Sequence, residues 1–172
     1  MLEHSFLLVH GWSRVDDSPG AWARAVTNDG GRRLGFVRFE GDPLASWFSW
    51  LRKARLDVFE TEDASHLMSL TRAWGVLRAW DVHDAEERHV GRINPKTMMT
   101  GERVRLGFLD FESADQGRIL DQTGQVLAQY GRKGALVEVT FTPGSSANPF
   151  LRMLILGSIL TLEPAPSEPR TK

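Results

Sequence analysis

The stretch Asn148-Pro149-Phe150-Leu151-Arg152-Met153-Leu154-Ile155-Leu156-Gly157-Ser158-Ile159-Leu160-Thr161-Leu162 decides the fold of this chain. It predicts a helix over residues 149–162, because Asn148 can cap the first turn and Pro149 has a preset φ and no N–H to satisfy. Glu163-Pro164 ends it, since proline cannot continue the helical hydrogen bonds. Apolar side chains surround the axis, and those expected in the core are Phe150, Leu151, Leu154, Ile155 and Ile159. A helix that is apolar on every side is buried on every side, in protein or in lipid.

The length of this helix favours protein over lipid as its surroundings. About 14 residues make a helix of about 21 Å, whereas a bilayer core needs about 20 apolar residues. Arg152 lies in the first turn, where a charge near the membrane interior costs a few kcal/mol. A membrane span stays an alternative, but the favoured interpretation is a helix enclosed by the rest of the chain.

The composition of the chain excludes several classes of function. The chain has 172 residues, 41% of them hydrophobic, a net charge of -1 and no cysteine. This length suggests one domain, which we place at residues 1–162 with a disordered proline-rich tail at 163–172. The balanced charge gives no general attraction to nucleic acid, and the lack of cysteine excludes disulfides and thiolate chemistry. The N-terminus has no signal-peptide pattern, so a cytoplasmic location is expected.

Residues 5–141 form short alternating runs separated by turn residues, which is typical of an all-β sandwich or barrel. Three runs share a closer form, in which an acidic or Asn turn precedes a bulky and then a small residue; they begin at Asn28, Asp84 and Asp121. This is a weak internal repeat of hairpins. About eleven strands are predicted, at residues 5–10, 22–27, 34–39, 57–60, 67–70, 80–82, 90–93, 108–111, 118–120, 125–128 and 135–141.

The strands and the helix complement each other. Eleven or twelve antiparallel strands suffice to close a barrel wider than the eight-stranded kind. A helix with its side chains is about 10–12 Å across and would fill such a barrel. We therefore predict a mainly β fold, a closed antiparallel barrel of about twelve strands around a central hydrophobic C-terminal helix.

This pattern resembles the tubby-like C-terminal fold, and within it the LURP-one-related and phospholipid scramblase-like family. The resemblance extends from about Ser5 to Leu162 and depends on residues 84–93, 121–128, 137–141 and 148–162. It implies a barrel of about twelve strands around a hydrophobic helix. The acidic calcium-binding segment and the cysteine-rich and proline-rich segments of scramblases are absent here. Tubby proteins bind phosphoinositide head groups in a basic pocket, but no residue of that pocket can be matched to this sequence.

The stretch Leu44 to Ala54 is the main candidate for a binding surface. Leu44, Trp47, Phe48 and Leu51 would share one helical face, with cations following at once. Aromatic rings beside cations suit a membrane interface, and exposed Trp and Arg also suit a protein partner. The alternative is a cover over one mouth of the barrel, because an apolar helical stripe usually faces its own core. The candidate lipid- or partner-binding residues are Trp47, Phe48, Trp50, Arg52, Lys53 and Arg55.

Other polar groups suggest no chemistry. Arg132-Lys133 is expected in a solvated turn, and Arg103 and Arg105 on the outer face of a strand that also holds Val104. The five histidines lack metal-ligand spacing, and no phosphate loop, nucleophile elbow or acid–base pair is present. We expect no metal, no cofactor and no enzymatic activity.

The expected function is a non-enzymatic barrel that binds lipid head groups or a membrane surface, or regulates another protein. Two alternatives stay open: phospholipid translocation of the scramblase kind, and a structural or protein-interaction domain without a lipid role. The expected partner is anionic membrane lipid or a protein, and no nucleic acid is expected. A ligand inside the barrel is disfavoured, because the helix would fill the cavity that it needs.

Overall fold

The computed structural model describes residues 1–15, 21–41, 54–61, 64–72, 79–113, 115–145 and 148–162. In these residues it has one sheet of thirteen strands, a short 3-10 turn (η2) and one helix. The elements are β1 (Phe6–Val9), β2 (Ser13–Arg14), β3 (Ala21–Thr27), β4 (Arg33–Gly41), β5 (Ala54–Glu60), β6 (His66–Arg72), β7 (Trp80–Asp84), β8 (His89–Asn94), β9 (Thr97–Thr100), β10 (Arg105–Phe111), β11 (Gln116–Asp121), β12 (Val126–Lys133), β13 (Leu136–Phe141), η2 (Pro143–Ser145) and α1 (Pro149–Leu162).

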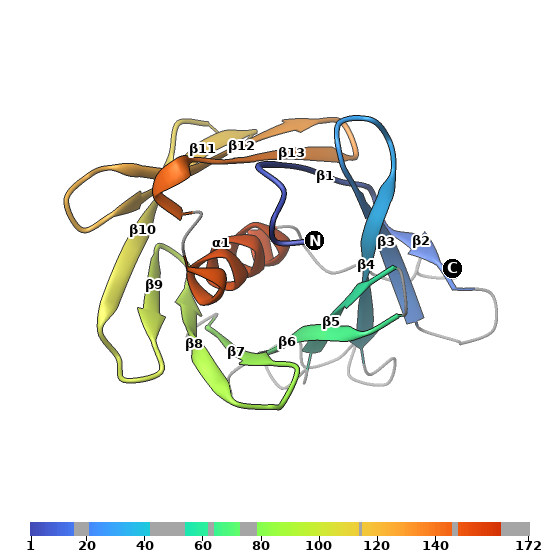
Figure 1. Cartoon of the computed structure of the whole chain (residues 1–172), viewed down its shortest axis with the longest axis horizontal. Helices are drawn as coiled ribbons and strands as arrows, with labels where there is room; N and C mark the ends of the chain where they lie inside the picture. Colours follow the sequence, from blue (N-terminus) through green and yellow to red (C-terminus); the bar gives the residue numbers. More distant parts are fainter. Residues whose placement is uncertain are drawn as a thin grey trace, which may run out of the picture.

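The sheet closes on itself through its first strand (Figure 1). From β2 to β13 each strand pairs antiparallel with its neighbour in sequence. β1 pairs with β13 from Phe6↔Thr140 to Val9↔Val137, and also with β3 at Leu8↔Thr27. β2 continues the line of β1 along β3, so β1 and β2 count as one interrupted strand of a closed twelve-stranded barrel. The predicted mainly β barrel around a C-terminal helix is confirmed.

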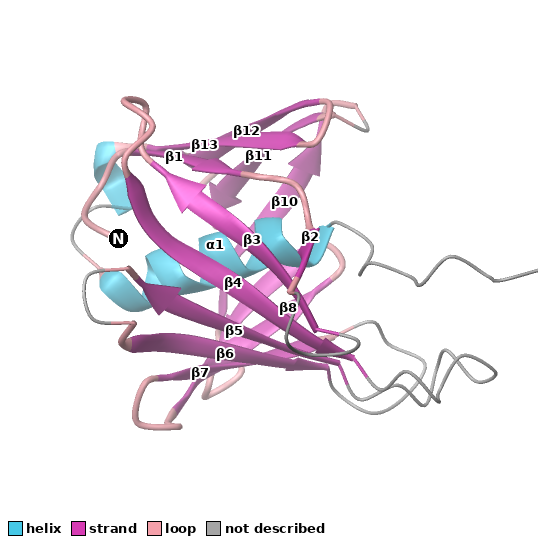
Figure 2. Cartoon of the chain, turned by 90° about the vertical axis from the view of Figure 1, so that its right-hand side faces the viewer, coloured by secondary structure: helices cyan, strands magenta, loops and turns pink. Residues whose placement is uncertain are grey.

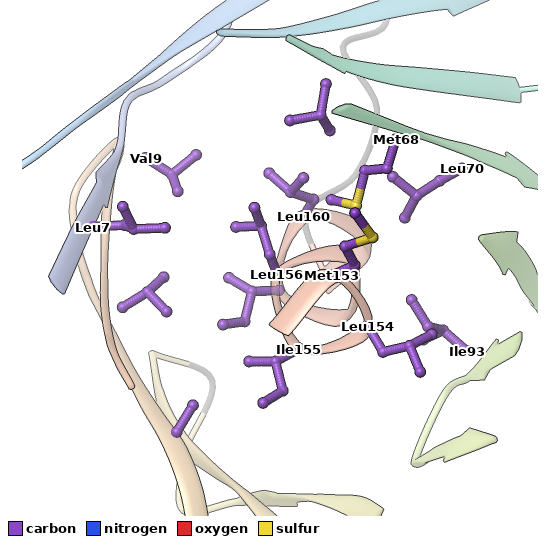
Figure 3. Packing of buried hydrophobic residues seen from close by; sticks show 14 of the residues in the cluster. Leu7, Val9, Met68, Leu70, Ile93, Met153, Leu154, Ile155, Leu156 and Leu160 are labelled. Carbon is purple, nitrogen blue, oxygen red and sulfur yellow. The ribbon is translucent and has the colours of Figure 1, made fainter. Parts of the chain in front are cut away.

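The helix α1 runs through the barrel from one end to the other (Figure 2). Its start is capped as predicted: Asn148 Oδ1 accepts the Leu151 N–H at 3.2 Å, and the Asn148 carbonyl accepts the Arg152 N–H. Every residue from Arg152 to Leu160 is buried. Among the helix residues predicted in the core, Leu154, Ile155 and Ile159 are at most 3% exposed. Side chains from the helix and from strands around it, such as Leu7, Leu70 and Ile93, meet in one core (Figure 3).

The helix approaches one side of the barrel more closely than the other. A Cβ added to Gly157 would lie 2.9 Å from Leu70 on β6 and from Ile93 on β8. A Cβ on Gly91 of β8 would lie 3.1 Å from Leu154 and 2.2 Å from the Met99 carbonyl. Two glycines thus remove the side chains that would keep the helix away from β6–β9. The axis of α1 is displaced toward these strands.

Two residues of the first helical turn differ from the prediction. Phe150 is 47% exposed, and Leu151 is only partly buried, because the first turn projects past the ends of the strands. Arg152 is 4% exposed, with its guanidinium 4.8 Å from the Phe141 ring centre. Its Nη1 donates to the carbonyls of Leu2 and His4. The buried cation therefore holds the N-terminal segment against the helix.

The hairpin turns at the end where α1 begins share one hydrogen-bond pattern. Asn28, Asp84, Thr100 and Asp121 each accept, at a side-chain oxygen, the backbone N–H four residues later, at 2.8, 2.8, 3.1 and 2.9 Å. The carbonyl of each residue accepts the N–H three residues later. The repeat predicted at Asn28, Asp84 and Asp121 is confirmed. Thr100 adds a fourth copy, which the sequence pattern missed because a hydroxyl replaces the carboxylate.

Each of these turns ends on a residue with positive φ, and the four are Gly31, Glu87, Arg103 and Gly124. The geometry corresponds to a type I turn followed by a bulge residue in the left-handed region. Glycine reaches that region freely, whereas Glu87 and Arg103 do so against the steric cost of a Cβ.

Three local predictions need correction. Arg132 and Lys133 are not a turn, because they are the last residues of β12 and pair with Val137 and Leu136. Arg103 and Val104 lie in the turn before β10, and Val104 is 52% exposed. The strand β9 was not predicted, since Pro95-Lys96 makes a two-residue turn that divides what looked like one irregular segment.

Candidate binding surfaces

The predicted aromatic and basic segment connects two adjacent strands at one end of the barrel. Trp47, Phe48, Trp50, Arg52 and Lys53 lie outside the described residues. The flanking positions Gly41 of β4 and Ala54 of β5 pair with each other. Neighbouring strands of this sheet are antiparallel, so β4 and β10 run in the same direction and end at the same end of the barrel. Phe111, the last residue of β10, lines a cavity together with residues at the end of α1. The segment therefore joins β4 to β5 at the end of the barrel where α1 finishes.

Arg55 is the one predicted binding residue within the described chain, and its charge is compensated. Its Nε donates to Asp57 Oδ1 at 2.8 Å, and its Nη2 donates to Glu87 Oε1 at 3.1 Å. The hydrogen bond to Asp57 is the main reason why the pKa of Arg55 is raised, against the lowering effect of its partial burial. With two carboxylates as partners, Arg55 contributes to the outer wall of the barrel and adds little net positive charge to the adjoining segment.

A row of polar side chains crosses the outer face of β5–β8. Asp57, Ser69 and His83 occupy directly opposed positions on β5, β6 and β7, and His83 is opposite His89 on β8. Asp57 is 8% exposed and Ser69 is fully buried, with no hydrogen-bond partner for its hydroxyl among the described residues. The rings of His83 and His89 lie 5.4 Å apart, tilted by 47°. Because Ser69 has no contact with solvent, this row presents no accessible nucleophile.

An ion pair between β7 and β8 lies next to this row of polar side chains. Arg92 donates to both carboxylate oxygens of Asp81, at 2.7 and 3.0 Å. Burial is the largest influence and raises the pKa of Asp81, but the hydrogen bond and the charge of Arg92, with smaller contributions from His89 and His83, together outweigh it, and the net pKa lies below the usual value. His89 Nε2 lies 3.5 Å from Asp81. No group of three or more His, Cys, Asp or Glu side chains in the described residues could hold a metal ion.

A cavity of about 580 Å³ opens at the barrel end where α1 begins. Leu34, Leu67 and Met153 form its apolar part, and Arg32, Arg33 and Glu60 provide its charges. The amino group of Met1 lies against Glu60. Charges of both signs surround this cavity, so it carries no clear preference for an anion or a cation.

A second cavity, of about 440 Å³, lies at the opposite end between the last turns of α1 and strands β10–β13. Its walls are Phe111, Tyr130, Arg132 and Val137, and its floor is Ile159 and Leu162. Burial raises the pKa of the Tyr130 hydroxyl, and the nearby Arg132 charge offsets part of this effect. Phe111 is 41% exposed at the rim. This cavity lies on the side from which α1 is displaced.

Sequence reasoning missed both cavities, because each gathers residues from distant parts of the chain. Tyr130 and Arg132 are two positions apart on β12, so an alternating pattern could have placed both inside the barrel. We instead assigned Arg132 to a turn, and this error concealed the cavity. None of the helices in the described part of the chain is long and apolar enough to cross a membrane.

No family model matches this sequence. A search of curated proteins likewise found no match. Among solved structures, the chain is similar to the X-ray structure of an Arabidopsis thaliana protein, with 11% sequence identity and a TM-score of 0.53. The similarity covers 92% of this chain and 90% of the other. At this identity the two proteins share a fold, which is the closed antiparallel barrel with a C-terminal helix along its interior.

Proposed function

We propose that this chain is a non-enzymatic binding module of the tubby-like kind, related to the LURP-one and scramblase-like group, that acts at anionic membrane surfaces in the cytoplasm. One observation carries the proposal. The segment 42–53, which holds Trp47, Phe48, Trp50, Arg52 and Lys53, joins adjacent strands at one end of a barrel whose interior is occupied by α1. Because α1 occupies the middle of the barrel, a membrane surface or a protein partner can be contacted only at the ends and on the outer wall.

The composition of this segment suits a lipid head-group layer. Trp and Phe rings favour the depth of the head groups, and each cation near an anionic membrane contributes about 1 kcal/mol. Arg52 and Lys53 together would then contribute about 2 kcal/mol, or about 25-fold in affinity. Arg55 is left out of the proposed site, because Asp57 and Glu87 compensate its charge.

Co-sedimentation with vesicles tests this proposal. Vesicles with anionic lipid should bind the wild-type chain at low salt, whereas vesicles of neutral lipid should bind it far less. The double variant Arg52→Gln/Lys53→Gln should lose about 25-fold in affinity, and Trp47→Ala/Trp50→Ala should weaken binding to both kinds of vesicle. A matched control is Arg33→Gln/Arg103→Gln, which removes two exposed cations at the opposite end of the barrel. Equal binding of the first double variant and this control would contradict the proposal.

Arg55→Gln separates structure from binding. Because Arg55 is already paired, this substitution should leave vesicle binding unchanged while it lowers the stability of the β5 region.

Translocation of lipid is less well supported as the function, since Arg152 to Leu160 of α1 are buried within the protein. Reconstituted vesicles should accordingly show no flip-flop above the protein-free rate.

A further inference from the structure

The displacement of α1 toward β6–β9 leaves the cavity of about 440 Å³ beside β10–β13. Its volume falls within the range of small-molecule sites, which are mostly apolar with a few placed polar groups. Val137 of β13 and Ile159 and Leu162 of α1 provide apolar surface, and the exposed Phe111 extends it to the rim. The helix therefore leaves part of the barrel interior unfilled at the end where it finishes.

Three polar side chains also line this cavity, and two of them are already engaged within the protein. Arg132 has an interaction partner, so no charge preference of the cavity can rest on its guanidinium. The Ser113 hydroxyl oxygen accepts the backbone N–H groups of Asp115 and Gln116, at 3.2 and 3.1 Å, in the turn between β10 and β11. Neither side chain gives the cavity a reason to select a charged ligand.

The Tyr130 hydroxyl is the third polar group, and it makes no hydrogen bond with the described residues although Tyr130 is only 8% exposed. A hydroxyl that leaves water without finding a partner is unfavourable, so a ligand that accepts its hydrogen bond gains affinity. Tyr130 is opposite Gly117 of β11, where a Cβ would lie 2.7 Å from the hydroxyl oxygen. The missing side chain at 117 therefore leaves room for the Tyr130 ring. Burial also raises the pKa of Tyr130, so the hydroxyl stays protonated near neutral pH and can donate.

We propose that this cavity binds a small uncharged apolar molecule with one hydrogen-bond acceptor, such as an aromatic ketone, whose oxygen accepts from the Tyr130 hydroxyl and whose body lies against Phe111, Val137 and Ile159. A carboxylate or an ammonium group would lose its hydration here without gaining a free opposite charge, so charged analogues bind more weakly. The proposal is independent of the vesicle-binding function above, and either can fail without the other.

The chain offers a built-in reporter, because Tyr130 is its only tyrosine. Full-length protein labelled with 3-fluorotyrosine should give one fluorine resonance, and 2-acetylnaphthalene should shift this resonance in a saturable way. The same ring with a charged group, as 2-naphthoate or 2-naphthylmethylammonium, should bind at least 10-fold more weakly. The analogue 2-ethylnaphthalene has nearly the same shape but no acceptor, and it should bind about 5-fold more weakly, which is the ratio expected for one neutral hydrogen bond.

Variants measured by equilibrium dialysis separate the cavity from the rest of the surface. Tyr130→Phe should weaken 2-acetylnaphthalene binding about 5-fold and leave 2-ethylnaphthalene binding unchanged, because only the ketone loses a partner. Val137→Phe should fill the cavity and abolish the binding of both ligands. Its matched control is Val104→Phe, which adds the same ring in an exposed turn at the other end of the barrel and should bind as the wild type does. If Val137→Phe fails to fold, Tyr130→Phe still decides, since it removes only one hydroxyl.

Three results would overturn the proposal. The first is no saturable shift with 2-acetylnaphthalene in the folded wild-type protein. The second is tighter binding of either charged analogue than of the ketone, which would mean that a charge in the cavity, and not the Tyr130 hydroxyl, selects the ligand. The third is equal affinity of the wild type and Tyr130→Phe for 2-acetylnaphthalene. None of these measurements involves a membrane, so the vesicle-binding proposal is tested separately.

Discussion

Truncation of Leu156 to alanine measures how much of the stability depends on the central helix. Leu156 lies in the middle of α1 and is 0% exposed. Loss of its three terminal carbons removes about 2.5 kcal/mol of transfer free energy, at about 0.8 kcal/mol for each group. The cavity left behind adds about 1–2 kcal/mol, since closely packed neighbours on all sides relax only partly. The free energy of unfolding should therefore fall by about 3.5–4.5 kcal/mol.

Thermal unfolding followed by circular dichroism should show this loss as a fall of about 8–15 °C in the melting temperature, for a domain of this size. Phe150→Ala on the same helix is the control. Phe150 is 47% exposed, so a larger truncation there should cost only about 1 kcal/mol. Leu156→Asp should give no soluble protein, because the buried charge would have no partner. If Leu156→Ala costs no more than Phe150→Ala, the helix does not form the centre of the core.

Three further predictions address the turns and the buried arginine. Arg103→Gly should stabilise the chain by about 1 kcal/mol, because Arg103 holds a φ of 65° that glycine adopts freely, and Gly124→Ala should destabilise it by a similar amount; urea midpoints measure both. Burial raises the pKa of Asp84, but its hydrogen bonds with Arg88 outweigh this and leave the pKa lowered. The stability that Asp84 contributes is therefore present above its unfolded pKa of about 3.9 and is lost as the pH falls through the lower folded value, so Asp84→Asn should flatten the loss of stability from pH 5 to pH 2. Arg152→Met should cost about 1.5–3 kcal/mol, with increased hydrogen exchange in residues 1–5, because two backbone carbonyls lose a charged donor.

The architecture could be predicted because its determinants are local. Period-two alternation and turn residues identify hairpins, and the fully apolar run at 149–162 requires complete enclosure. Closure of the barrel through β1 and the displacement of α1 could not be predicted in the same way. Both depend on contacts between residues far apart in sequence, such as Leu8 with Thr27 and Gly157 with Leu70.

The role of Arg152 could not be predicted from the pattern of residues along the sequence. In the sequence it counted only as a cost against a membrane span. In the fold it is buried, burial lowers its pKa, and the backbone of residues 2–4 supplies acceptors that no helical pattern could indicate. Arg55 is a second residue whose environment the sequence did not indicate. Arg55 looked like one more cation beside Trp50, but the register of β5 places it against Asp57, and the turn after β7 supplies Glu87.

The position of the helix decides where the barrel keeps unfilled space. Twelve strands enclose more space than one helix fills, and the unfilled space can lie on all sides of the helix or on one side only. It lies on one side here, because Gly91 and Gly157 let α1 contact β6–β9 and so leave the opposite wall uncovered. At the barrel end where α1 begins, Arg152 and the N-terminal segment occupy part of that space. At the other end no comparable segment of the described chain does so, and the space remains as the cavity beside Tyr130 and Arg132. The two glycines that tighten one half of the core are therefore the reason that the other half keeps a cavity.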